Sequence, residues 1–173
     1  MRGAFALLAA LLVACATPPN VSTSKHLDPP ARPANVSATK HLIRVQVVEV
    51  TDGDTVKLLY NGQRITARLE QIDAPEKRQP FGLESRAALA RLCLGRPAAI
   101  APVDTDRYGR TLVRLHCDGV DANAEQIRTG HAWVYWRYAR EVELFDLQTD
   151  ARRARAGLWG ELNPRAPWEF RAR

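Results

Sequence analysis

Apolar positions alternate with polar ones or recur at helical spacing through most of the chain from residue 42 onward. Runs rich in β-branched and aromatic residues predict strands at residues 42–50, 55–60, 63–72, 98–103 and 111–117. Apolar residues at helical spacing, each stretch followed by glycine, predict helices at residues 83–94, 123–129 and 141–156. The order of these elements predicts an α+β fold, a five-stranded OB-type Greek-key β-barrel with three helices.

An Asn-Gly pair at residues 61–62 separates the second and third expected strands. Such a pair favours a two-residue type I′ turn, because both central positions need a positive φ. This turn fixes the register of the hairpin and places Thr55 opposite Arg68, so that Asp54 lies at the same end as Arg68 and Asp73. The register also gives one face four apolar residues, Val56, Leu58, Ile65 and Ala67.

The end of this hairpin gathers side chains that suit a phosphodiester. Carboxylates beside an arginine can bind a divalent cation and an anion together. A second polar turn, at residues 105–110, contributes Arg107, Tyr108 and Arg110. A guanidinium group can donate two parallel hydrogen bonds to two oxygens of one phosphate. Asp-Gly turns and arginine-rich loops are usually solvated surface when they occur singly, so the prediction depends on their combination.

The length of the chain is consistent with one domain, and its net charge with binding to a polyanion. The chain has 173 residues and a formal net charge of +6. Without the N-terminal segment about 130 residues remain, which is enough for a single domain with a core. The positive charge serves either solubility alone or attraction to nucleic acid, and the arginine and carboxylate motifs favour nucleic acid.

The N-terminus has the pattern of a lipoprotein-type signal peptide over residues 1–15. Arg2 precedes an apolar stretch that is too short to span a bilayer comfortably. Leu-Val-Ala-Cys at residues 12–15 resembles a lipobox, which would make Cys15 the lipidated N-terminus of an exported, membrane-anchored protein facing the periplasm or the exterior. Cleavage after Ala16 is the alternative, and it would give a secreted protein.

The remaining chain divides into three parts. Residues 16–41 contain many prolines and small polar residues and carry a duplicated segment, so we expect a disordered tether. Residues 42–162 form the expected domain, and residues 163–173 the expected C-terminal tail. Cys93 and Cys117 remain after processing, and an even count in an exported protein favours a disulfide over two buried thiols.

Three motifs in order resemble those of the thermonuclease, or staphylococcal-nuclease-like, family. They are Asp-Gly-Asp-Thr at residues 52–55, Arg-Leu-x-x-Ile-Asp-Ala-Pro-Glu at residues 68–76, and Asp-Arg-Tyr-Gly-Arg at residues 106–110. The resemblance runs from about residue 43 to residue 159. It implies the same barrel fold and a calcium-dependent endonuclease that hydrolyses DNA and RNA and leaves 3′-phosphate ends.

The resemblance also implies roles for individual residues. The calcium ligands would be Asp54, Asp73 and the backbone carbonyl of Ala74. The catalytic residues would be Arg68, Glu76 and Arg110. Glu76 would orient or deprotonate the attacking water, while calcium and the two arginines would stabilise negative charge on the phosphoryl oxygens.

Substrate contacts follow in the same way. Arg107 and Tyr108 would hold a neighbouring phosphate, and Trp136 and Tyr138 would stack on bases, which favours single-stranded DNA and RNA. The chain departs from the best-known member of the family at Ala74, where that member has threonine, and at Trp136, where it has tyrosine. The loop between Glu76 and Phe81 is also shorter, which affects the expected rate and not the type of reaction.

Other classes of function fit parts of the pattern. A lipoprotein of this fold without catalysis would bind nucleic acid only, but the five residues Asp54, Arg68, Asp73, Glu76 and Arg110 are all present. A sugar- or peptide-binding OB-type domain would explain the fold and not these side chains. No protein partner is inferred from the sequence.

Overall fold

The structure is a computed structural model that describes residues 42–172. The expected signal peptide, Cys15 and the whole of the expected tether lie outside these residues. The strands are β1 (Ile43–Val50), β2 (Thr55–Tyr60), β3 (Gln63–Leu69), β4 (Ile72–Asp73), β5 (Ala98–Thr105), β6 (Thr111–Cys117), β7 (Val120–Asp121) and β8 (Trp133–Val134). The helices are α1 (Gly82–Cys93), α2 (Ala122–Arg128), α3 (Val142–Arg153), the 3-10 helix η1 (Gly157–Gly160) and α4 (Pro167–Arg171). Within residues 42–172, no helix combines the length and the apolar character that crossing a membrane requires.

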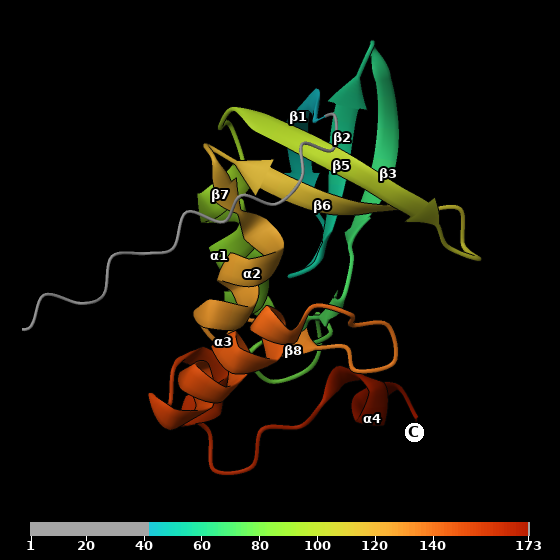
Figure 1. The fold of residues 1–173 in the computed structure, drawn as a ribbon. Helices are drawn as coiled ribbons and strands as arrows, with labels where there is room; N and C mark the ends of the chain where they lie inside the picture. Colours follow the sequence, from blue (N-terminus) through green and yellow to red (C-terminus); the bar gives the residue numbers. More distant parts are fainter. Residues whose placement is uncertain (1–41, 173) are drawn as a thin grey trace, which may run out of the picture. The chain divides into compact units, whose positions relative to one another are not determined.

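Five strands close into a barrel (Figure 1). β1 pairs antiparallel with β2 and β5, β2 pairs with β3, and β5 pairs with β6. A parallel pairing of β3 with β6 joins the two ends of this sheet. The expected α+β fold with an OB-type barrel is therefore confirmed. Its interior is apolar and includes Val56, Leu58, Ala67, Leu69, Val113 and Leu115.

The β2–β3 hairpin has the register that the sequence predicts. Thr55 lies opposite Arg68 and Tyr60 opposite Gln63. Asn61 and Gly62 have φ angles of 47° and 77°, as a type I′ turn requires. The register thus carries Arg68 to the end of the hairpin at which Asp54 enters β2.

The third expected strand, residues 63–72, is interrupted in the structure. β3 ends at Leu69, and Gln71 adopts a φ of 63°, which an extended strand does not allow. The chain resumes as β4, which leaves the barrel sheet and pairs antiparallel with β8. This separate two-stranded sheet holds Asp73 opposite Trp133.

The C-terminal part also differs from the expected elements. The helix expected over residues 141–156 ends at Arg153 and is followed by η1. Residues 163–173, expected as a tail, contain α4, which begins with proline at its first position. Proline is well tolerated there because that backbone N–H has no partner within the helix. In Figure 1 α4 lies near the segment that follows β8.

A disulfide links the first helix to the barrel. Cys93 at the end of α1 and Cys117 at the end of β6 are joined, with a Cα–Cα distance of 5.1 Å. Both residues are fully buried. The two elements that the sequence suggested for the bridge are therefore connected in the structure.

Candidate active site

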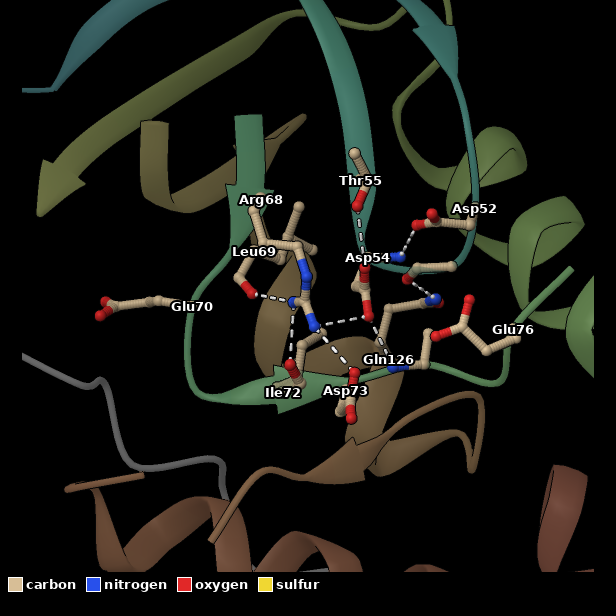
Figure 2. Close-up of polar contacts among 12 residues, drawn as sticks. Asp52, Asp54, Thr55, Arg68, Leu69, Glu70, Ile72, Asp73, Glu76 and Gln126 are labelled. Carbon is tan, nitrogen blue, oxygen red and sulfur yellow. Dashed lines mark hydrogen bonds and ion pairs between the residues drawn. The ribbon is translucent and has the colours of Figure 1, made fainter. Parts of the chain in front are cut away.

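Arg68 is the centre of a group of polar contacts at the end of β3 (Figure 2). Its Nη1 donates hydrogen bonds to the backbone carbonyls of Leu69 at 2.6 Å and Ile72 at 2.8 Å. Its Nη2 lies 3.0 Å from Asp54 Oδ2 and 2.9 Å from Asp73 Oδ1. Only 11% of the side chain is exposed. One guanidinium thus joins the ends of two strands to two buried carboxylates.

Asp54 is one of these two buried carboxylates, with 7% of its side chain exposed. Its Oδ2 accepts a hydrogen bond of 2.6 Å from the backbone N–H of Ala74. Burial raises the pKa of Asp54 to about 8, against the opposing effect of Arg68, and the negative charges of Asp52 and Asp73 raise it further. The ionised form of Asp54 therefore needs more positive charge than Arg68 supplies.

The Asp-Gly-Asp segment is held against the helices. A Cβ added to Gly53 would lie 1.8 Å from Ser85 Oγ of α1, so only glycine fits this position. Gln126 of α2 donates hydrogen bonds to the carbonyls of Gly53 at 2.7 Å and Ser85 at 3.2 Å. The backbone N–H of Leu69 donates to the carbonyl of Asp54 at 2.8 Å. These contacts position the Asp54 side chain from three elements.

Glu76 follows Asp73 on a tight loop. Its backbone N–H donates to Gln79 Oε1 at 3.1 Å, and its carbonyl accepts from the Gln79 N–H at 2.8 Å. A Cβ added to Gly82 would lie 2.0 Å from the same carbonyl, so α1 begins directly against the loop. Figure 2 shows the Glu76 side chain extending from this loop towards the Asp54 side of the site.

Arg171 of α4 joins the site, although the sequence analysis did not predict it. Its Nη2 lies 2.7 Å from Asp73 Oδ2, and its Nη1 donates to Asp73 Oδ1 at 3.2 Å and to Glu76 Oε1 at 2.6 Å. Hydrogen bonding to Asp73 and then to Glu76 raises the pKa of Arg171 above its usual value. The signal in the sequence is weak: Trp168 and Arg171 are three residues apart after a proline, a spacing that puts both on one helix face.

The β5–β6 loop carries the other expected arginines. Arg110 pairs with Asp106 through Nε at 2.7 Å, and Asp106 also accepts the backbone N–H groups of Tyr108 and Arg110. Arg107 donates to Tyr108 Oη at 2.6 Å. Within residues 42–172, Arg110 has no hydrogen bond to the carboxylates around Arg68. The parallel pairing of Ala67 with Thr111 nevertheless starts β6 one residue after Arg110 and beside the Arg68 end of β3.

The expected stacking residues lie on the segment after β8. Trp136 is 58% exposed and Tyr138 is 65% exposed. The Arg137 guanidinium lies 5.2 Å from the centre of the Trp136 ring. By contrast, Trp159 is buried and makes an edge-on contact with Trp133. The two exposed rings are accessible to a ligand, while Trp159 packs inside the protein.

The residues expected to hold calcium fit a hard divalent cation. Asp54 Oδ2 and Asp73 Oδ1 lie 3.0 and 2.9 Å from the same nitrogen of Arg68, so the two carboxylates converge on one point of the site. Carboxylate and carbonyl oxygens are the donors that calcium prefers. In the part of the chain that the structure describes, no group of three or more acidic, histidine or cysteine side chains could hold a metal. Any ion here would therefore rely on two carboxylates, a carbonyl and solvent or substrate oxygens.

The raised pKa of Asp54 predicts how stability depends on pH without metal. The folded protein retains a proton that the unfolded chain releases near pH 4, so the free energy of unfolding should fall as pH rises from about 4 to about 8. We expect Asp54→Asn to remove this dependence. Thermal unfolding in a chelator at several pH values measures it, and parallel slopes for the wild type and the variant would contradict the expectation.

Comparison with known proteins identifies the family of this chain. The family model for staphylococcal nuclease homologues matches residues 66–161. An "Uncharacterized endonuclease" of Escherichia coli is 38% identical over 132 residues, which cover 76% of this chain and 86% of that protein. A "Micrococcal nuclease" of Shigella flexneri is 37% identical over 139 residues, which cover 74% of this chain and 80% of that protein. The chain belongs to the staphylococcal nuclease homologue family.

Proposed function

We propose that this phosphodiester-hydrolysing nuclease is a calcium-dependent endonuclease that cuts DNA and RNA and leaves 3′-phosphate ends. Membership of the family supports nuclease activity. The observation that carries the proposal is the convergence of Asp54, Arg68, Asp73 and Glu76 at one end of the barrel. Calcium dependence and the position of the cut are inferences from this donor set and from the family.

Arg68 is the residue best placed to stabilise the transition state. Two carbonyls and two carboxylates hold its guanidinium in one orientation, and one of these contacts would give way to a phosphoryl oxygen on which negative charge develops. Arg110 contributes a second guanidinium from the β5–β6 loop, after it exchanges its contact with Asp106 for substrate. Calcium would supply further positive charge at the oxygens of Asp54 and Asp73 when bound.

Glu76 takes the role of orienting the attacking water. The Gln79 amide and the start of α1 fix its backbone, so the carboxylate lies beside Asp73 at the edge of the site. An ordinary glutamate is a weak base. Most of the rate enhancement in this proposal therefore comes from the arginines and the cation. Glu76 contributes mainly by holding the attacking water in position.

Substrate binding uses the two exposed regions next to this site. Arg107 and Tyr108 provide a phosphate contact, and the rings of Trp136 and Tyr138 provide stacking surfaces. An aromatic ring stacks on any unpaired base, which gives a preference for single strands without a preference for sequence. The net charge of +6 adds a general attraction to nucleic acid.

We expect Glu76→Gln to lower kcat by about 10²–10⁴-fold with little change in KM, because the carboxylate acts in the bond-making step. The matched control is Arg107→Ala, which should raise KM more than it lowers kcat. A nuclease assay on denatured DNA at several substrate concentrations separates the two. Wild-type kcat in the Glu76 variant would mean that Glu76 does not act in the bond-making step, whereas no cleavage by any of the proteins, the wild type included, would favour a protein of this fold that only binds nucleic acid.

Replacing Trp136 by alanine should reduce the preference for single strands. Loss of one stacking surface costs about 1–3 kcal/mol of binding per base, and duplex DNA makes no such contact. The ratio of cleavage rates on denatured and duplex DNA of the same sequence measures the effect. Arg140→Gln, elsewhere on the same segment, controls for altered charge and folding. An unchanged ratio in Trp136→Ala would exclude stacking on this ring.

The N-terminal segment leads us to propose export and a lipid anchor at Cys15. A lipoprotein carries more than one acyl chain, which is enough for stable membrane attachment. Cys15→Ser should therefore move the protein from the membrane fraction to the soluble fraction, or block its maturation. Fractionation followed by mass spectrometry of the N-terminus is the measurement. A soluble wild-type protein that begins at Ala16 or Thr17 would mean secretion without an anchor.

A further inference from the structure

The C-terminal segment, residues 164–172, reaches the candidate active site through one side chain. Arg171 contacts both oxygens of Asp73 and one oxygen of Glu76 at distances between 2.6 and 3.2 Å. Asp73 is an expected calcium ligand, and Glu76 is expected to orient or deprotonate the attacking water. One guanidinium from the end of the chain therefore engages two groups that the proposed reaction needs.

Independent contacts dock this segment. The Trp168 ring stacks parallel to Tyr135, with centres 5.6 Å apart, and meets the edge of Trp133 at 5.7 Å. Gln79 Nε2 donates to the carbonyl of Arg165 at 2.6 Å, while Gln79 Oε1 accepts from the N–H of Glu76. The segment is thus attached to the loop that carries Glu76 and to the segment after β8.

Arg171 and a divalent cation compete for the same oxygens. Asp73 Oδ1 already accepts from Arg68 and Arg171, and Oδ2 accepts from Arg171. A cation binds through the same lone pairs, and positive charges at such short range repel each other. Full contact of a cation with Asp73 therefore requires one guanidinium to withdraw.

The structure indicates which arginine withdraws. Arg68 is 11% exposed and is held by two backbone carbonyls as well as by carboxylates. Arg171 is 42% exposed, and its side-chain hydrogen bonds within the described residues go to Asp73 and Glu76 alone. Its guanidinium can turn into water at a modest cost. The helix that carries it, α4, has only five residues and depends on docking for its stability.

We propose that residues 164–172 form an autoinhibitory latch, in which Arg171 holds Asp73 and Glu76 until a divalent cation displaces it. The proposal rests on the calcium site of the proposed function. It assigns Arg171 to regulation of the site and not to the chemical step. Because linkage is reciprocal, the latch weakens cation binding by the factor by which the cation weakens docking of Arg171.

Calcium titration by calorimetry on the full chain tests the latch directly. Arg171→Gln should bind calcium about 5–50-fold more tightly than the wild type, within the usual range of such coupling. Arg153→Gln is the matched control, because it removes the same charge from an arginine that is 78% exposed and, among the residues that the structure describes, forms an ion pair with Asp150 alone. Arg171→Lys should fall between the two, since lysine keeps the charge and loses the bidentate contact.

Hydrogen exchange provides a second measurement that does not depend on activity. Calcium should accelerate exchange in residues 167–172 of the wild type and leave α1 unchanged. Equal calcium affinity in Arg171→Gln and Arg153→Gln, weaker binding in Arg171→Gln, or unaltered exchange in α4 would each overturn the latch while the proposed nuclease function stands. Absence of calcium binding in all the proteins would overturn the calcium dependence, and the latch with it.

Discussion

The bridge that Arg68 makes between two buried aspartates is the interaction on which both the fold and the site depend. Asp54 directly precedes β2 and Asp73 ends β4, and neither is stable as an isolated buried charge. The guanidinium contacts both carboxylates, and it also binds the carbonyls at the end of β3 and within β4. The same group that holds this end of the hairpin therefore also holds the two carboxylates of the candidate site together.

The sequence predicts the part of the site that follows from strand register. An Asn-Gly turn has one favoured geometry, so the positions of Asp54 and Arg68 follow by counting residues from it. The alternation of apolar and polar residues in the segments that form β1, β2, β5 and β6 likewise predicts the strands of the barrel. The motifs around residues 68–76 place Glu76 close to Asp73 because only two residues separate them.

The parts that were not predicted depend on tertiary contacts alone. β4 and β8 have two residues each, which is too short for any periodic pattern to reveal them. Arg171 is 98 residues from Asp73 in the sequence, and no local signal connects the two. Its position is decided by Trp168, which stacks on Tyr135 of the segment after β8.

The two-residue ladder of β4 and β8 has a consequence for where a nucleic acid would be cut. It pairs Asp73 with Trp133, and Trp136 follows three residues later on the same segment. If a base stacks on Trp136 as proposed, this ladder sets the spacing between that base and the phosphate beside Arg68. The cut would then fall at a fixed number of nucleotides from the stacked base. A change in the length of chain between Val134 and Trp136 would alter that number.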